Sequence, residues 1–366
     1  MSTSDNRAPH DPAAGAHNLL TACVGVCAGD SVLLVAEPAG SRHYDPSVAA
    51  FLAERARNLG AHVIVRSVAP AGGPEDAPES LREQIEAADH TLFLNRIGDQ
   101  LRFAPLPGAG SKTVVYTLDM DQLGSAFAVT PYAVWQDILG RLIARLDAAR
   151  SYSIRCPRGT DLRMQPEGAR TATKPARGFT VGSFPVMVVP PIPASRLCGR
   201  LVISHALTQT GVHAYDDGVI PLDSPLTLNL ENGTILGIEG DAALVAKVKA
   251  QFARVAAQFG GEQWALDSWH AGINPFTFFP RPALSDLGRW ESVAFGSPRY
   301  AHFHMCGPAP GDICGQVFDP TIVFDDAVLW QDGRAAFLTP DDKHRLLEHR
   351  GIPRDALEQP RGIGVG

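Results

Sequence analysis

Hydrophobic positions in the first part of the chain alternate between two patterns. Residues 31–36, Ser-Val-Leu-Leu-Val-Ala, form a continuous apolar run that is typical of a buried strand. Residues 46–60 instead place apolar side chains at helical spacing and end on a glycine, as many helices do. Repetition of the two patterns predicts strands at 31–36, 62–68, 91–94 and 112–117, and helices at 19–29, 46–60, 81–88 and 131–149.

Apolar runs between amphipathic helices indicate a parallel sheet that is covered on both faces. We therefore expect residues 1–150 to form a Rossmann-like or flavodoxin-like α/β domain. The junction after the first predicted strand reads Ala36-Glu-Pro-Ala-Gly-Ser41, which lacks the GxGxxG fingerprint of dinucleotide-binding domains. The predicted layers alone therefore say nothing about function.

The pattern changes at residue 151. Strand-like runs such as 200–206 and 226–230 are separated by polar turns and prolines, and Asn232-Gly233 supplies the left-handed positions of a hairpin turn. A long helix is predicted at 241–259, and residues 163–177 have the composition of a mobile polar loop. Residues 151–366 are therefore expected to form an α+β domain dominated by antiparallel sheet.

Composition narrows the class of protein. The 366 residues are long enough for two domains, and a net charge of −7 without a basic stripe argues against nucleic acid as a partner. The longest apolar runs are too short to span a bilayer, and residues 1–10 lack the apolar segment of a secretory signal. Six scattered cysteines fit a reducing compartment. We expect a cytoplasmic protein whose partner is a small molecule rather than a membrane.

The segment Tyr300-Ala-His-Phe-His-Met-Cys306 is the first candidate for chemistry. Residues two apart in a strand point to the same face, so His302 and His304 can address one point. Two imidazoles on one face are a recurrent way to hold a mononuclear metal ion. The alternative interpretation is two buried histidines that hydrogen-bond to the backbone.

His270 strengthens the metal interpretation, because it ends a predicted strand that runs into the turn Gly272-Ile-Asn-Pro275. Three histidines, or histidines plus a carboxylate from Asp312 or Asp319, would form a facial site with open positions. Two further histidines of this half, His205 and His213, are candidates for general bases or for residues that orient a ligand; core or surface positions are the alternative for both.

The sequence resembles the family of 2,5-dihydroxypyridine 5,6-dioxygenases and, more distantly, aminopeptidase T metallopeptidases and 5-nitroanthranilate aminohydrolase. The resemblance is carried by residues 28–35, 53–63, 85–89, 184–190, 231–240, 270–275, 306–308 and 322–326. It implies an α/β domain followed by an aminopeptidase T-like α+β domain with a metal site, assembled into a homo-oligomer.

The metal ligands of these families do not carry over one by one. The peptidases place a glutamate where this chain has the acid-free segment 186–190, and a gapless match puts Ser268 at a second ligand position, two residues before His270. A His-x-Asp pair expected before residues 322–326 is missing from the segment 311–320. The resemblance therefore implies a shared fold with a rearranged metal shell.

Loss of both expected glutamates predicts one divalent metal ion, because a two-metal site needs bridging carboxylates. Fe(II) is favoured, and Mn or Zn is possible. The leading hypothesis is a non-haem Fe(II) dioxygenase that cleaves a small aromatic or N-heteroaromatic ring. The alternative is a metal-dependent hydrolase of the aminohydrolase, amidase or aminopeptidase kind, which would use a metal-activated water. The third hypothesis is a protein without enzymatic activity, which binds a small molecule and whose catalytic site has decayed.

Overall fold

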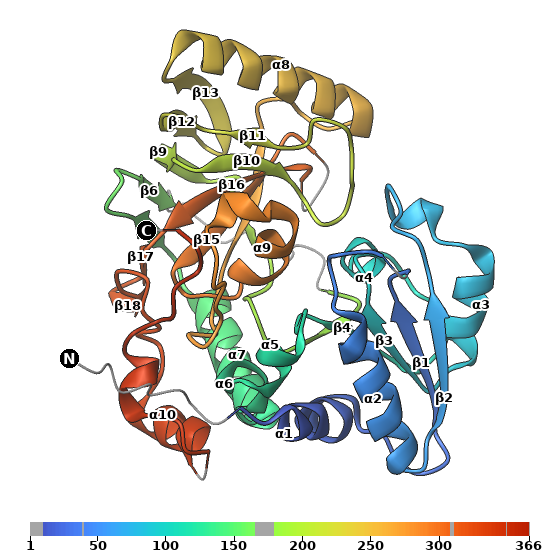
Figure 1. The fold of residues 1–366 in the computed structure, drawn as a ribbon. Coiled ribbons are helices and arrows are strands. Elements are labelled where there is room, and N and C mark those ends of the chain that lie inside the picture. Colours follow the sequence, from blue (N-terminus) through green and yellow to red (C-terminus); the bar gives the residue numbers. More distant parts are fainter. Residues whose placement is uncertain (1–9, 39, 165–178, 308–310, 349, 366) are drawn as a thin grey trace.

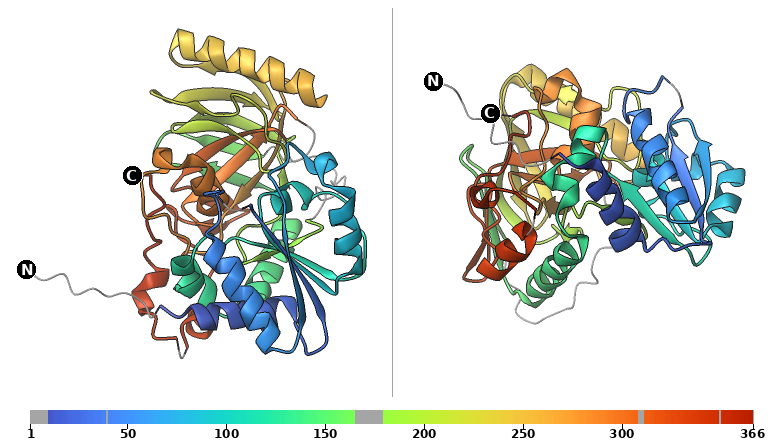
Figure 2. Two further views of the ribbon diagram at one scale, coloured as in Figure 1. Left: turned by 45° about the vertical axis from the view of Figure 1, so that its right-hand side comes forward. Right: turned by 60° about the horizontal axis from the view of Figure 1, so that its bottom comes forward.

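The computed structural model describes residues 10–38, 40–164, 179–307, 311–348 and 350–365. Within these ranges the chain forms one parallel and two antiparallel sheets, as the sequence predicts (Figure 1). The parallel sheet and the antiparallel sheets lie in separate halves of the molecule, side by side in Figure 1 and in the right-hand view of Figure 2. No helix among these residues is long and apolar enough to cross a membrane.

The parallel sheet has the strand order β2-β1-β3-β4-β7. Its strands are β1 (Ser31–Ala36), β2 (His62–Ser67), β3 (His90–Leu94), β4 (Ser111–Val115) and β7 (Gly182–Phe184). Four of them match the predicted strands to within two residues. The fifth, β7, comes from beyond Arg150 and pairs in parallel with β4.

Burial on both faces explains the unalternated apolar run of β1. Val32 and Leu34 belong to the same apolar cluster as Leu52 of α2 (Pro46–Asn58). Leu33 belongs to the other cluster, together with Leu81 of α3 (Glu79–Ala87). Because successive strand side chains face opposite sides, every position of the strand has to be apolar.

The first predicted helix differs from the expectation of 19–29. Helix α1 (Pro12–His17) begins earlier, where the Asp11 carboxylate accepts a hydrogen bond from the backbone N–H of Ala14. It continues as a π-helix over Asn18–Val24 and ends at Gly25, whose φ is 83°. A left-handed glycine directly after the last turn stops the helix before Gly29, because it turns the backbone out of the helical path.

The six-stranded antiparallel sheet has the order β11-β10-β16-β15-β14-β8. Its strands are β8 (Ile192–Pro193), β10 (Ala206–Gln209), β11 (Ile220–Pro221), β14 (Leu266–Ala271), β15 (Tyr300–Met305) and β16 (Ile313–Phe318). The central strands β15 and β16 are buried along their whole length.

The seven-stranded antiparallel sheet has the order β13-β12-β9-β6-β5-β17-β18. Its strands are β5 (Tyr152–Arg155), β6 (Asp161–Met164), β9 (Leu197–Ile203), β12 (Leu226–Glu231), β13 (Thr234–Glu239), β17 (Thr321–Phe324) and β18 (Ala327–Trp330). The predicted hairpin turn is present, with φ of 48° at Asn232 and 74° at Gly233. The loop predicted at 163–177 lies outside the described residues, except for its first two, which end β6.

The remaining helices complete the two halves. They are α4 (Ile97–Leu101), α5 (Met120–Gly124), α6 (Ala126–Val129), α7 (Tyr132–Ala148), α8 (Ala242–Phe259), α9 (Leu287–Ala294) and α10 (Pro340–Leu347), with short 3-10 helices at Pro74–Asp76, Ala283–Ser285 and Arg354–Leu357. The predicted helices at 131–149 and 241–259 match α7 and α8. Two of the short helices, α4 and α9, border the cavity beside β15.

Candidate metal centre

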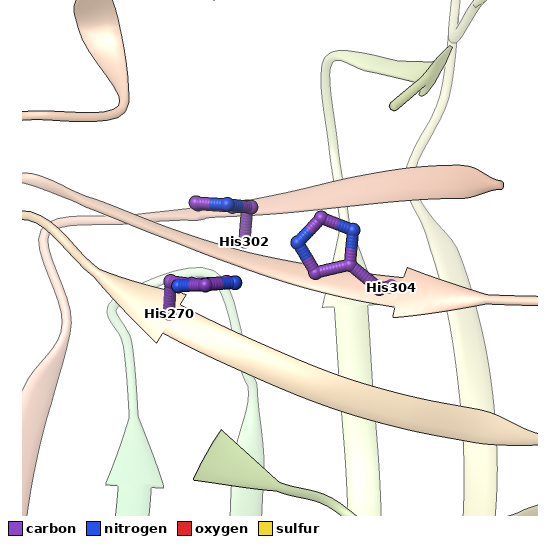
Figure 3. A group of neighbouring side chains, drawn as sticks. All are labelled: His270, His302 and His304. Atoms are coloured by element: carbon purple, nitrogen blue, oxygen red, sulfur yellow. The ribbon is translucent and has the colours of Figure 1, made fainter. Parts of the chain in front are cut away.

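Three histidines converge on one face of the six-stranded sheet. His270 of β14 lies opposite His302 of β15 in the antiparallel register, and His304 lies two residues further along β15. One ring nitrogen of each can be chosen so that all three lie within 4.8 Å of one another. Figure 3 shows the rings of His270 and His302 parallel and that of His304 turned across them, with ring centroids 4.8–5.1 Å apart. The sequence hypothesis that these three meet therefore agrees with the geometry.

The ring nitrogens of these histidines are buried and mostly without partners. The Nδ1 atom of His270 lies 2.9 Å from the carbonyl oxygen of Val189, to which it can donate, and this leaves Nε2 as an acceptor. Within the described part of the chain, Nε2 of His270, Nδ1 of His302 and both nitrogens of His304 have no hydrogen-bond partner. Buried polar atoms are normally satisfied, so several unsatisfied imidazole nitrogens around one point fit a metal ion.

All three imidazoles are held in the neutral form. Burial lowers the pKa of His270 to about 3, despite the hydrogen bond to Val189. Burial, together with the charge that neighbouring histidines would carry, lowers the pKa of His302 and of His304 well below the ordinary value. The neutral imidazole is the form that binds metal ions, so these side chains are ready to bind near neutral pH.

A cavity of about 70 Å³ borders the three histidines. The parallel-sheet half contributes Arg96, Asp99 and Arg102, which lie in or beside α4, just after the carboxyl end of β3. Carboxyl ends of parallel strands are common ligand sites in α/β folds. Further walls come from β10, α9 and β15, so the cavity lies between the two halves of the molecule.

Arg102 is held in place by several contacts. Its Nη1 donates to the hydroxyl oxygen of Tyr116 (3.2 Å) and lies 3.6 Å from Asp99 Oδ1, while the Tyr116 hydroxyl donates to the same Asp99 oxygen (2.6 Å). The guanidinium also lies over the rings of Phe103 and Phe179, at 5.0 and 5.2 Å from their centroids. These contacts fix one positive charge, and its counter-charge, in the wall of the cavity.

Glu291 of α9 is a site residue that sequence reasoning missed. It lines the cavity, and its Oε1 atom is buried without a hydrogen-bond partner among the described residues. Burial raises the pKa of this carboxyl to about 7, although a hydrogen bond with Thr208 and the charge of Arg96 oppose the change. A carboxyl group that titrates near neutral pH beside a candidate metal site is suited to proton transfer.

The two predicted carboxylate ligands are not part of the group of three histidines. Asp319 has a φ of 50° and pairs with Arg299, whose Nε and Nη2 lie 2.6 and 3.0 Å from its carboxylate oxygens. Asp312 precedes β16 and is buried, and burial raises the pKa of its carboxyl to about 6. The charge of His213 lowers this pKa and that of Glu75 raises it, both by smaller amounts. The geometry therefore offers a set of three histidines without either aspartate.

The two predicted catalytic histidines do not border this cavity within the described structure. His205 is half-buried beside the rings of Trp290 and Phe318, at centroid distances of 5.6 and 5.9 Å. His213 stacks on Phe259 at 4.6 Å, and its charge would act on Asp312. Their surroundings fit the alternative of aromatic packing, and their catalytic roles stay predictions.

Replacement of Glu291 by glutamine is expected to stabilise the metal-free protein above pH 7. Burial raises the pKa from 4.5 to about 7, so the unfolded chain releases this proton at lower pH than the folded state. Below pH 4.5 the carboxyl is protonated in both states, and the folded state keeps the full stability that this proton provides. That stability is lost as the pH rises through 7 and the buried carboxyl ionises. We expect Glu291→Gln to gain ~3 kcal/mol at pH 8 and close to nothing below pH 4.5.

Urea denaturation of both proteins across this pH range measures the difference. A constant difference at every pH would show that the carboxyl of Glu291 titrates normally.

Comparison with known proteins completes this description. No protein-family model matches the sequence, and no curated protein matches it. The structure is similar to that of 2,5-dihydroxypyridine dioxygenase from Pseudomonas putida KT2440, with a TM-score of 0.57 and 14% sequence identity. The alignment covers 90% of this chain and 97% of that chain. The two proteins therefore share a fold over nearly their whole length, which confirms the predicted resemblance to this dioxygenase at the level of the fold.

Proposed function

We propose that this protein is a mononuclear metal-dependent enzyme that acts on a small aromatic or N-heteroaromatic compound. The observation that carries the proposal is the group of three buried, neutral histidines with unsatisfied ring nitrogens at the wall of a cavity. His270, His302 and His304 would hold the ion, and His270 is already oriented by the carbonyl group of Val189. Such an orienting partner is typical of histidines that bind metals.

The favoured reaction is cleavage of an aromatic ring by dioxygen. The shared fold with a dioxygenase supports this choice, and a set of three protein ligands leaves coordination positions free for substrate and dioxygen. Bound Fe(II) would supply the redox chemistry that ring cleavage requires. Phe295 and Tyr300 line the cavity, where they would contact the ring and exclude water.

A hydrolase is the second candidate, and one observation favours it. Three histidines are a ligand set of catalytic zinc, which would supply a water of lowered pKa. Glu291 lies in the same cavity with a pKa raised to about 7, so it is placed to accept a proton. If the protein instead cleaves a ring with dioxygen, the carboxyl of Glu291 would hold or move a proton of the substrate hydroxyl group.

Anaerobic and aerobic assays with the Fe(II)-loaded protein distinguish the two reactions. A panel of hydroxylated benzenes and pyridines is incubated with the protein, and loss of ring absorbance and uptake of oxygen are measured. We expect consumption of a substrate only with dioxygen. Turnover that continues without dioxygen, with release of ammonia or another leaving group, identifies the hydrolase instead.

Metal content provides the control for both reactions. A protein purified with stoichiometric iron, manganese or zinc excludes a binding protein with a decayed site. Failure to retain any of the three ions contradicts the proposal as a whole.

A further inference from the structure

The charges around the cavity are unbalanced. Histidine binds a metal ion as a neutral imidazole, so three histidines would leave a divalent ion with its full charge. The cavity is also lined by Arg96 and Arg102, against the carboxyl groups of Asp99 and Glu291. Burial keeps Glu291 partly protonated near neutral pH, because its pKa is raised to about 7. A loaded site would therefore carry an excess of positive charge.

Most positive groups near this cavity already have an anionic partner. Arg102 lies 3.6 Å from Asp99, as described above. Arg289 of α9 donates from Nη2 to Asp119 at 2.7 Å. Neither guanidinium is therefore free to neutralise a bound anion without loss of an existing ion pair.

Arg96 is different. It precedes α4, and its hydrogen bonds with described residues come from the backbone: its N–H donates to Glu37 Oε1 at 3.4 Å, and its carbonyl oxygen accepts from the N–H groups of Asp99 and Gln100. No ion pair joins its guanidinium to a carboxylate in the described ranges, although its charge opposes the rise in the pKa of the Glu291 carboxyl. A half-buried guanidinium in a cavity wall without a partner is a favourable place for an anionic group, because it is already partly desolvated.

We propose that the substrate of this site carries a carboxylate on its ring, and that the guanidinium of Arg96 binds this carboxylate. The inference rests on the proposed function, since it assigns the substrate class of the same cavity. A planar guanidinium matches a carboxylate through two parallel hydrogen bonds, which an ammonium group cannot reproduce. Phe295 and Tyr300 line the same cavity and provide contacts for the aromatic ring.

Binding measurements with matched probes test this assignment. The 2-, 3- and 4-hydroxybenzoates are titrated by calorimetry against the corresponding neutral hydroxybenzyl alcohols, with zinc-loaded and with metal-free protein. We expect at least one hydroxybenzoate to bind the wild type about 10-fold or more tightly than its alcohol. In Arg96→Gln this hydroxybenzoate should bind about 10- to 100-fold more weakly, while the alcohol should change by less than about 3-fold.

Two further variants complete the design. Arg96→Lys keeps the charge without the planar fork and should show an intermediate loss of hydroxybenzoate affinity. Arg57→Gln changes an exposed arginine of α2 and should have no effect. Circular dichroism of each variant verifies the fold.

The assignment is overturned if the hydroxybenzoates and the hydroxybenzyl alcohols bind with equal affinity, or if Arg96→Gln leaves the affinity for hydroxybenzoate unchanged. It is also overturned if no hydroxybenzoate binds with a Kd below about 10 mM. These outcomes leave the proposed metal site intact when the protein still retains stoichiometric metal. Conversely, a protein that retains no metal but binds a hydroxybenzoate through Arg96 refutes the proposed function and supports the anion site.

Discussion

Replacement of His304 by alanine is expected to remove the bound metal ion while the fold survives. Neither ring nitrogen of His304 has a hydrogen-bond partner among the described residues, so the change breaks no hydrogen bond with them. It leaves two neutral imidazoles, His270 and His302, which are too few donors to retain a divalent ion through purification. Metal content measured by plasma mass spectrometry should fall from about one ion per chain to less than about 0.1.

Asp319→Asn is the matched control for this experiment. The sequence marks Asp319 as a possible ligand, whereas its carboxylate is paired with Arg299. Asparagine tolerates the φ of 50° at this position, so the change removes the charge without forcing the backbone to move. We expect full metal content in this variant. Full metal content in His304→Ala, or loss of metal in Asp319→Asn, would show that the ion binds elsewhere.

The metal-free protein is expected to lose stability steeply as the pH falls below 6.5. In the folded state burial keeps His270 neutral down to about pH 3, and it lowers the pKa of His302 and His304 as well. Histidines of the unfolded chain take up protons near pH 6.5. Acid therefore favours the unfolded state by about 1.4 kcal/mol per pH unit for each group, or about 4 kcal/mol per unit for the three.

Above pH 6.5 these imidazoles are neutral in the folded and in the unfolded state, and the folded protein has its full stability. This stability is lost as the pH falls below about 6.5. The half-buried His43, whose pKa desolvation lowers to about 3, adds a loss of similar size. Domains are typically stable by only about 5–15 kcal/mol, so unfolding is expected about one to three pH units below 6.5. Urea denaturation at intervals between pH 8 and 5, after removal of metal by a chelator, measures the slope.

His304→Gln supplies the control for this slope. Glutamine is neutral at every pH, so the variant should lose about 1.4 kcal/mol less per pH unit than the wild type. An unchanged slope would mean that His304 takes up its proton at the same pH in the folded and in the unfolded state, and hence that it is not held neutral for a metal ion.

The amino-acid sequence alone determined much of the fold and the centre of the candidate site. Strand β1 was predicted because burial on both faces demands an unbroken apolar run, and α2 because one buried face leaves a helical period. His302 and His304 were predicted to share a face because strand side chains alternate with a period of two. These features depend on local backbone geometry, so the pattern of neighbouring residues is enough to predict them. The end of the first helix was misplaced because Gly25 and Gly29 look alike in sequence.

Only the tertiary structure decided what surrounds the three histidines. Arg96 and Glu291 are far apart in sequence and line one cavity because α4 of the parallel-sheet half and α9 of the other half both border it. The sequence also did not show which carboxylate belongs to the site. Asp319 is paired with Arg299, whereas the Oε1 atom of Glu291 is buried without a hydrogen-bond partner among the described residues. A charged side chain can stay solvated, form an ion pair or become desolvated, and the outcome depends on which distant elements pack over it. A local pattern of residues does not predict that packing.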